Sequence, residues 1–210
     1  MKFWRELESI LTGHPSTDTV FNQYRDCDNL VDVPTAPLIR TANLRAYMEK
    51  AGKTATVVIV GEAAGPWGCR FSGVPFTGER QLLDPSFPFQ GSQSSRAHPP
   101  HISRTATMFW EIMLPYYDRF VAWDAFPLYP HKQHDLFSVR NPTKSEVSQF
   151  GPALRLLIQH LAPTRLVAVG RAAEKVITSL GEVATYVRHP SQGGKAAFTV
   201  AMQRLLGAKR

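Results

Sequence analysis

Three short stretches of the sequence combine ionisable, aromatic and glycine residues more densely than a simple turn requires. The first, "GEAAGPWGCRFSGVPFTG" (residues 61–78), holds five glycines and two prolines together with a carboxylate, an arginine and large aromatic side chains. The second, "WDAFPLYPH" (123–131), carries Asp124, and the third, "RHPSQGG" (188–194), carries His189. A carboxylate and a histidine can exchange protons or stabilise developing charge, and glycines let backbone amides approach a ligand closely. The three stretches are therefore the candidates for an active site.

The elements that must position these stretches alternate between strands and helices. "TATVVIV" (54–60) is a continuous run rich in β-branched residues, which is typical of a strand buried on both faces. Further strands are predicted at 119–126, 164–170 and 184–190. Apolar residues at helical spacing predict helices at 3–11, 43–52, 105–117, 143–161 and 171–180. This alternation predicts an α/β fold, a three-layer sandwich with a central, mostly parallel four-stranded sheet flanked by helices.

In open parallel sheets, ligands bind beyond the carboxyl ends of the strands. In this sequence that rule selects residues 61–78, 124–130, 170–171 and 189–194. These are also the segments with the most reactive side chains. We therefore expect them to form one composite active site.

Length and composition favour a single domain. With 210 residues, of which 43% are apolar, the chain can bury a substantial core. We expect residues 1–210 to form one domain, in which a helical part over residues 1–50 packs on the α/β core. The polar, proline-rich stretch 79–104 is expected to be a mobile surface loop.

Composition also excludes several classes of protein. No apolar run approaches the roughly 20 residues that a membrane-spanning helix needs, and the N-terminus lacks the pattern of a secretory signal. We therefore expect a cytoplasmic protein with no membrane contact. Cys27 and Cys69 are too few for a disulfide framework or for a four-cysteine zinc or iron–sulfur site. The formal charge of +7 suits a polyanionic partner.

The ordered set of motifs resembles the uracil-DNA glycosylase superfamily over about residues 54–206. Gly61-Glu62-Ala63-Ala64-Gly65 and the later "GVPFTG" resemble the first motif of that family, in its "GEAPG…GxPFxG" version. "RHPSQGG" resembles its "HPS" motif, and "VAVGRAAEKV" (167–176) resembles the strand–helix step before it. The resemblance implies an enzyme that hydrolyses the N-glycosidic bond of uracil in DNA and leaves an abasic site, with no cofactor and no metal.

The resemblance also implies roles for individual residues. Phe76 would stack on the extracted base, while Gly61 and Ala63 would let the backbone approach it. His189 would donate a hydrogen bond to uracil O2 as negative charge grows on the departing base. Ser191 would hold a DNA phosphate. The plainer alternatives are a Phe76 ring that fills the core, a structural histidine at 189 and a Ser191 that caps the last helix.

The sequence departs from the family pattern in three ways. Asp124 stands where the family has an asparagine that reads uracil, and an ionised carboxylate can accept from N3–H but cannot donate to O4. Either a backbone N–H serves O4, or the carboxyl is protonated, or the base specificity has changed. The alternative role of Asp124 is to organise the following turn. Ala63 stands where the best-known branch has a catalytic aspartate, so Glu62 is the candidate for activating water unless it only braces the loop. The branch that shares "GEAPG" usually has a four-cysteine iron–sulfur cluster, which this chain cannot build.

The expected partner is uracil-containing DNA, single- or double-stranded, bound by a monomer; in a bacterium the protein would associate with the nucleoid. Gln192 and Lys195 would form a weak polar wedge, which favours single-stranded or mispaired DNA because base extrusion costs less there. Loop 79–104 would face the DNA. The expected phosphate contacts include three arginines, Arg70, Arg104 and Arg171.

Two other functions remain open at this point. A non-catalytic nucleic-acid-binding module of the same fold is favoured by Asp124 and Ala63, and a glycosylase with altered specificity would act on hypoxanthine or xanthine. A dinucleotide-dependent oxidoreductase is disfavoured because residues 61–78 contain no G-x-G-x-x-G. Zinc hydrolysis is disfavoured because His131 and His134 lack a third convincing ligand.

Overall fold

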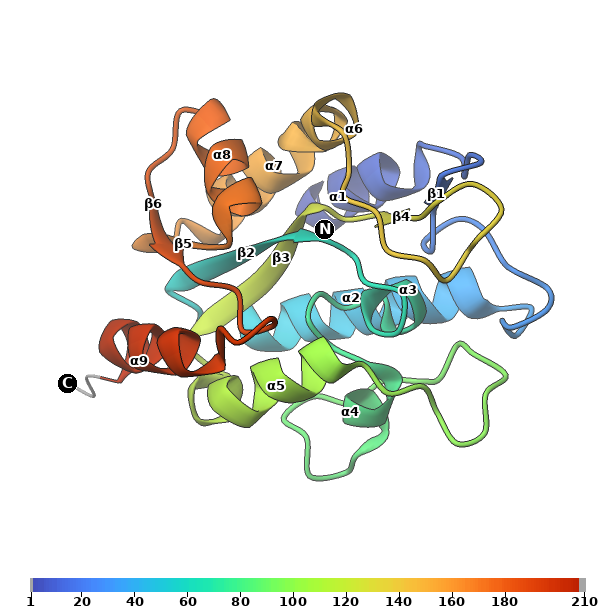
Figure 1. Ribbon diagram of the computed structural model, residues 1–210, viewed down its shortest axis with the longest axis horizontal. Helices are drawn as coiled ribbons and strands as arrows, with labels where there is room; N and C mark the ends of the chain where they lie inside the picture. The colour runs from blue at the N-terminus through green and yellow to red at the C-terminus, as the bar shows by residue number, and fades with distance from the viewer. Residues whose placement is uncertain (1, 208–210) are drawn as a thin grey trace.

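Four parallel strands form the central sheet of the computed structural model, which describes residues 2–207 (Figure 1). They are β2 (Val57–Ala63), β3 (Phe120–Phe126), β5 (Arg165–Val169) and β6 (Ala184–Val187), arranged in the order β3-β2-β5-β6. All three strand pairings are parallel. The predicted four-stranded parallel sheet is therefore confirmed. The chain leaves β2 toward β3 on one side and later crosses to β5 on the other, so the order of the strands reverses beside β2.

Helices cover both faces of this sheet, as predicted for a three-layer sandwich (Figure 1). One layer contains α1 (Lys2–Thr12), α6 (Lys144–Gln149), α7 (Gly151–Leu161) and α8 (Arg171–Ser179). The other contains α2 (Ala36–Ala51), α3 (Cys69–Ser72), α4 (Glu79–Leu83), α5 (Arg104–Met113) with the 3-10 turn η1 (Leu114–Tyr116), and α9 (Lys195–Leu206). None of the described helices is long and apolar enough to cross a membrane.

The N-terminal helices pack on the core from both sides: α1 contacts α7, and α2 contacts α3 and β3. Between them, β1 (Val20–Phe21) pairs antiparallel with β4 (Tyr129–Pro130) in a short ribbon that the sequence pattern did not predict. This ribbon ties the N-terminal region to the segment that follows β3. Every residue of β3 is buried, in agreement with a strand covered on both faces.

Strand β2 extends further into the glycine-rich stretch than its β-branched run indicates. Gly61 pairs with Asp124 and Ala63 pairs with Phe126, so Gly61-Glu62-Ala63 belong to the strand rather than to the loop. The long, fully buried neighbour β3 offers hydrogen-bond partners this far along the sheet. Consequently Gly61 and Asp124 lie side by side at the carboxyl edge.

Two helix boundaries differ from the prediction, each at a proline. The helix expected over 143–161 is two helices separated at Phe150, because Pro152 lacks an N–H and is favoured only in a first helical turn. Likewise, α2 begins at Ala36 with Pro37 in its first turn, well before the start of the helix expected at 43–52.

The expectation of a surface loop over residues 79–104 is wrong for the helical and buried parts of that stretch. It begins with helix α4, and its Phe87 and Phe89 are buried against Trp110. The buried Glu79 carboxylate accepts hydrogen bonds from the backbone amides of residues 94 and 95, each at 2.8 Å. Buried rings and a buried carboxylate anchor the segment, and polarity along the sequence does not reveal either.

Candidate active site

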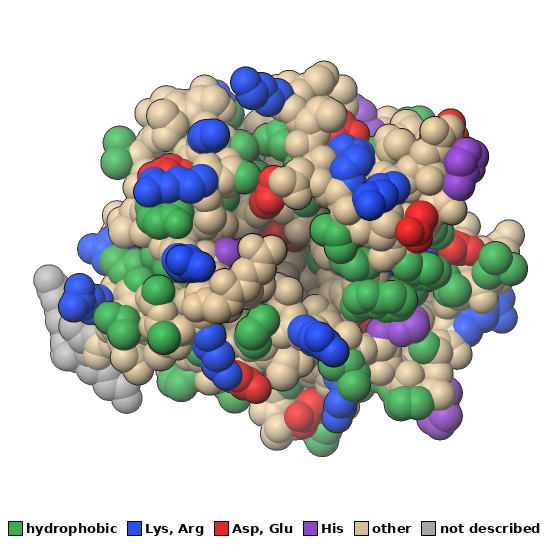
Figure 2. Space-filling model, viewed as in Figure 1, with side chains coloured by type: hydrophobic (Ala, Val, Ile, Leu, Met, Phe, Trp, Pro, Cys, Tyr) green, Lys and Arg blue, Asp and Glu red, His purple; other side chains and the backbone are tan. Residues whose placement is uncertain are grey.

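A cleft of about 990 Å³ opens at the carboxyl edge of the sheet. Figure 2 shows it as the hollow near the middle of this face, with Lys and Arg side chains around it. Its walls come from five parts of the chain: residues 62–69 with Phe76, residues 101–106, Asp124 with residues 129–130 and 139–142, residues 169–172, and His189 with residues 191–192. The structure thus brings together all four segments that the sheet-edge rule selected.

The floor of the cleft is a tight contact between Phe76, Gly61 and Asp124. A Cβ atom at Gly61 would lie 2.5 Å from Phe76 Cζ and 2.8 Å from Asp124 Oδ1, so only glycine fits there. Phe76 has a left-handed backbone (φ 55°) and stacks on Phe109 with the ring centroids 4.5 Å apart. Such a backbone persists in a non-glycine residue only when its surroundings hold it in place. Phe76 is therefore a braced ring that lines the cleft beside the Asp124 carboxyl.

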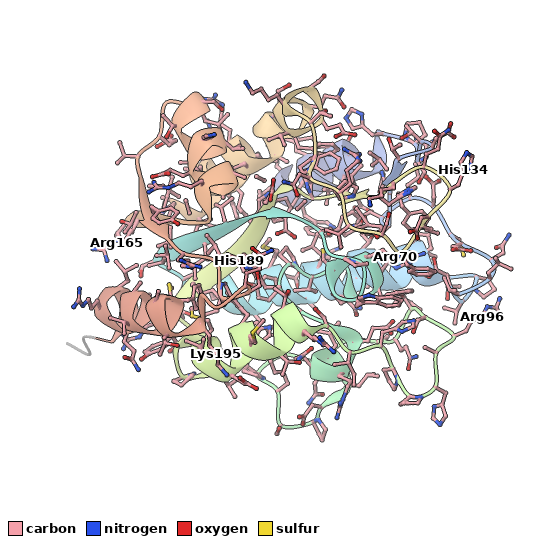
Figure 3. All side chains as sticks on the ribbon, viewed as in Figure 1. Arg70, Arg96, His134, Arg165, His189 and Lys195 are labelled. Atoms are coloured by element: carbon pink, nitrogen blue, oxygen red, sulfur yellow. The ribbon has the colours of Figure 1, made fainter. Side chains whose placement is uncertain are left out.

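His189 lies just beyond β6, where the chain turns toward α9 (Figure 3). The backbone N–H of Ser191 donates to His189 Nδ1 at 3.1 Å, and the Ser191 hydroxyl lies 2.7 Å from the same nitrogen. A nitrogen that accepts an amide hydrogen bond carries no proton, so the proton of the neutral ring is on Nε2. Burial lowers the pKa of His189, which favours this neutral form. The ring centroid lies 6.4 Å from that of Phe76.

Asp124 is a buried carboxyl with no cation to pair with among the described residues. It is 3% exposed, and burial raises its pKa to about 7, although a hydrogen bond with the Cys69 side chain acts in the opposite direction. Behind Cys69, the Tyr24 hydroxyl and the Gln23 amide both lie within reach of the thiol sulfur. Burial raises the pKa of the thiol and of the Tyr24 hydroxyl, so both groups are protonated at neutral pH. Asp124 is thus backed by uncharged donors.

Glu62 and Ala63, at the end of β2, both line the cleft. Glu62 is half-buried, and burial raises its pKa. Within residues 2–207 no side chain or amide donates a hydrogen bond to the Glu62 carboxylate. This is not the environment of a side chain that braces a loop. The carboxylate is instead free to bind a water molecule or a ligand in the cleft.

Only some of the residues expected to contact DNA lie in the cleft. Ser191, Gln192, Arg104 and Arg171 all line the cleft, and Arg171 stands at the start of α8. Lys195 lies at the start of α9 beside α5 (Figure 3), where its ammonium group is 2.6 Å from Glu111. A phosphate contact by Lys195 would therefore compete with an existing ion pair.

The expectation that Arg70 contacts a DNA phosphate is wrong, because this residue is not on the protein surface. Its side chain is fully buried, forms an ion pair with Asp32 at 2.8 Å, and lies over the rings of Phe21 and Phe71. Helix α3 turns this side chain toward the N-terminal region instead of the cleft. Arg70 therefore holds the glycine-rich loop against residues 20–32, and it cannot contact a phosphate without leaving the core.

Several cleft residues were missed by sequence reasoning. Trp67 and Cys69 belong to the glycine-rich stretch that was singled out, but the spacing of residues there did not indicate a function for either of them. His101 and Arg140 come from connections whose position relative to the sheet the sequence does not reveal. Arg140 forms two hydrogen bonds with the Glu146 carboxylate, which orders the wall of the cleft that precedes α6.

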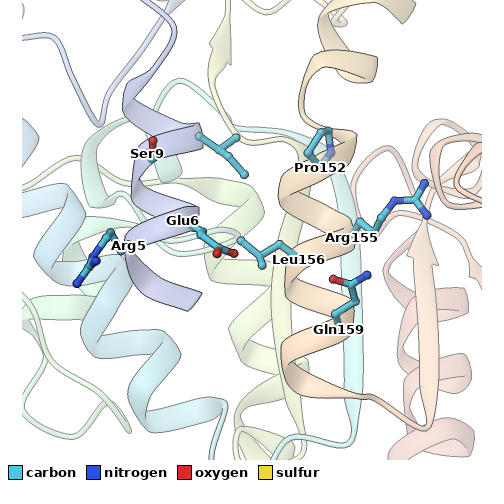
Figure 4. Close-up of a pocket in the computed structure, with 8 residues that line it drawn as sticks. Arg5, Glu6, Ser9, Pro152, Arg155, Leu156 and Gln159 are labelled. Carbon is cyan, nitrogen blue, oxygen red and sulfur yellow. The ribbon is translucent and has the colours of Figure 1, made fainter. Parts of the chain in front are cut away.

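A second hollow, of about 640 Å³, lies between α1 and α7 (Figure 4). It is lined by side chains of those two helices only, among them Glu6, Ile10, Arg155 and Leu156. None of its lining residues follows a strand of the sheet. No group of three or more His, Cys, Asp or Glu in the described part of the chain is placed to hold a metal ion. The cleft is therefore the candidate active site.

The comparisons with known proteins agree with this geometry. None of the curated proteins matches the sequence. Among solved structures, the crystal structure of wild-type Pedobacter heparinus SMUG2 is similar, with a TM-score of 0.62 over 98% of this chain and 99% of that chain. At 14% sequence identity that likeness concerns the fold. The model of the uracil DNA glycosylase superfamily matches residues 49–205, which include the whole sheet and nearly all of the cleft, and so the chain belongs to the uracil DNA glycosylase superfamily.

Proposed function

We propose that this protein is a monofunctional uracil-DNA glycosylase, which hydrolyses the N-glycosidic bond of uracil in DNA and leaves an abasic site. The observation that carries the proposal is the convergence of a braced aromatic ring, a buried carboxyl and a neutral histidine on one cleft. Phe76, Asp124 and His189 offer an aromatic face, a hydrogen-bonding edge and a polar donor, the three features needed to hold a flipped base.

His189 is the residue that we propose acts on the leaving group. Its Nε2–H can donate to uracil O2, and the hydrogen bond strengthens as the C–N bond breaks and the base becomes an anion. A donor fixed in advance by the Ser191 amide does not have to reorganise as this charge develops. A neutral imidazole serves this role without a positive charge on the histidine itself.

Asp124 reads the base in its protonated form. A neutral carboxyl group has one O–H donor and one carbonyl acceptor, so it can donate to uracil O4 and accept from N3–H. This is the same pattern that an asparagine amide presents. A pKa of about 7 makes the neutral form available at physiological pH, and the apolar surroundings of the group are the reason for that pKa.

Glu62 is the proposed water-activating group. Its carboxylate lines the cleft without a protein hydrogen-bond partner among the described residues, and its raised pKa makes it a better base than an exposed glutamate. The N-terminal turn of α8, which begins at Arg171 in the wall of the cleft, offers backbone amides to a phosphate of the bound strand.

The test is excision by the purified protein from oligonucleotides that contain uracil, hypoxanthine or xanthine, in single strands and in duplexes. Abasic sites are detected as strand breaks after alkali treatment. We expect breaks at uracil. We expect His189→Asn to lower the single-turnover rate more than the affinity for DNA, because the contact strengthens as the base departs. Phe76→Ala should lose about 1–3 kcal/mol of base stacking.

The matched control for His189→Asn is His134→Asn, an exposed histidine at the far edge of the molecule (Figure 3). It should excise uracil at the parent rate. Breaks at hypoxanthine or xanthine but not at uracil would reject the proposed substrate and keep the enzyme class. DNA binding without breaks at any base would identify a non-catalytic module instead.

A further inference from the structure

One aromatic side chain at the mouth of the cleft has no role in holding a flipped base. Trp67 follows the glycine-rich motif, is 40% exposed, and lines the same cleft as Phe76. Two more exposed apolar residues of the cleft wall are Ile102 and Val139, at 56% and 69%. Figure 2 shows hydrophobic side chains gathered on one side of the hollow. We call Trp67, His101, Ile102 and Val139 the rim patch.

Other aromatic rings pack against the Trp67 ring and leave it 40% exposed. It stacks on Phe137 with the centroids 5.0 Å apart and an interplanar angle of 7°, and His101 lies 5.1 Å away. His101 in turn packs on the buried Phe71, with the centroids 4.4 Å apart. A large ring that is fixed in this way loses little entropy when a flat ligand stacks on it. The rim patch therefore has the character of a preformed stacking surface.

The size of the cleft shows that one base does not fill it. A volume of about 990 Å³ is near the upper end of the roughly 300–1,000 Å³ that hold whole drug-sized ligands. The floor at Phe76 and Asp124 accommodates a single base, which leaves the space toward Trp67 for more of the ligand.

The charge at the rim patch selects the kind of ligand. Arg104 is exposed, begins α5 directly after Ile102 and Ser103, and has no ion-pair partner within residues 2–207. An apolar aromatic surface next to an unpaired guanidinium suits a chain that alternates flat rings with negative charges. Single-stranded nucleic acid is such a chain: its bases stack on aromatic side chains whatever their sequence, and its phosphates bind arginine.

We propose that the rim patch binds an unpaired nucleobase adjacent to the one on the cleft floor, with Trp67 as the stacking residue and Arg104 on the intervening phosphate. This inference rests on the proposed function, because it takes the flipped nucleotide as the first occupant of the cleft. The protein consequently binds at least two consecutive unpaired nucleotides. Single-stranded or locally melted DNA is the preferred substrate, and a fully paired neighbour has to unstack before it reaches Trp67.

The experiment measures binding of a fluorescein-labelled single-stranded oligothymidylate by anisotropy, with a paired hairpin as the second probe. Neither probe contains a base to excise, so the readout does not depend on catalysis. Trp67→Ala should weaken binding of the single strand roughly 5- to 140-fold, which is the loss of one stacked base. Trp67→Phe should recover most of it. Hairpin binding should change far less.

The matched control is Tyr117→Ala, which removes an aromatic ring of similar exposure (38%) just before β3, at the opposite edge of the sheet. It should bind as the parent does. Tryptophan fluorescence gives an independent readout, because Trp110 and Trp123 are buried and the partly buried Trp4 lies on α1, outside the cleft. DNA should therefore quench the exposed Trp67. The quenching should therefore disappear in Trp67→Phe.

The outcomes separate this inference from the proposed function. If the parent excises uracil and Trp67→Ala binds the single strand as tightly as the parent, the rim patch is not a base site, and the inference fails alone. If no base is excised but single-strand binding depends on Trp67, the proposed function fails and the binding site stands. Equal loss in Trp67→Ala and Trp67→Phe, or a parent that binds neither probe, overturns the inference and leaves the rim patch as a surface for a protein partner.

Discussion

Two aspartates are buried in this molecule, and their surroundings are opposite. Asp32 is fully buried between the guanidinium groups of Arg40 and Arg70, which are themselves fully buried. Asp124 is nearly as inaccessible at 3% exposure, yet among the described residues its side-chain hydrogen-bond partner is the Cys69 thiol, and no cation pairs with it. One carboxyl belongs to a closed ionic cluster, while the other lines a cleft.

The difference appears in their acidity. Burial by itself would raise the pKa of Asp32, but hydrogen bonds and charges from the two arginines outweigh it and leave that pKa below its ordinary value. At Asp124, only the Cys69 hydrogen bond opposes burial, and the pKa rises to about 7. Removing the carboxylate of Asp32 would leave buried charges without a partner, whereas the unpaired carboxyl of Asp124 itself costs stability, which is expected at a functional site.

The largest expected effect is on the ionic cluster. Asp32→Ala leaves Arg40 and Arg70 buried without their carboxylate, and breaking a buried pair in this way costs about 3–5 kcal/mol. The free energy of unfolding in urea measures this loss. The exposed Asp118→Ala is the matched control and should change stability by less than about 0.5 kcal/mol. A loss at Asp32 as small as that of the control would mean that the cluster does not stabilise the fold.

The second prediction is a gain in stability at Asp124, where the first is a loss at Asp32. The pKa of Asp124 is higher in the folded protein than in the unfolded chain. The contribution of this group to stability is therefore fully present below pH 3.8 and is lost as the pH rises to about 7. Asp124→Asn removes this loss, so the variant should gain on the parent across that range, by an amount on the order of 4 kcal/mol. Urea unfolding at several pH values tests this. A parent and variant whose stabilities change in parallel with pH would show that Asp124 is not buried as a neutral acid.

The third prediction concerns excision. If the protonated carboxyl reads uracil, the parent rate should fall about tenfold per unit as the pH rises above 7, and Asp124→Asn should lack this decline. Glu62 and His189 cannot cause it, because their active forms, the carboxylate and the neutral imidazole, are both favoured at higher pH. Single-turnover rates against pH provide the measurement. An alkaline decline that persists in Asp124→Asn would transfer the base-reading role to another residue.

The smallest effect should come from Cys69. Its hydrogen bond lowers the pKa of Asp124, so Cys69→Ala should raise that pKa and move the midpoint of the alkaline decline to higher pH, by less than about one unit. Cys69→Ser keeps a donor and should leave the midpoint near that of the parent. The same pH–rate series measures both variants. A shift to lower pH would contradict the proposed hydrogen bond.

Much of the fold follows from patterns that are local in the sequence. The β-branched run before Gly61 and the helical spacing after Thr143 are properties of adjacent residues, and they predicted the parallel sheet and its helical layers. The capping box of Thr143 and Glu146 at the start of α6 and the left-handed Gly181 after α8 are likewise features that a few adjacent residues encode. The ends of helices and strands do not follow from local patterns in the same way. A strand continues as long as its neighbour offers hydrogen bonds, and β2 therefore extends along β3 as far as Ala63.

For the cleft, local patterns along the chain indicated which strand ends carry reactive side chains, since a parallel sheet collects its carboxyl ends at one edge. Which neighbouring groups share the interior depends on how distant segments pack. Arg70 and Arg104 look equally available in the sequence, but α3 turns one into the core beside Asp32 and α5 presents the other to solvent. Burial and charge pairing depend on contacts between distant segments, and those contacts set the acidity of Asp124.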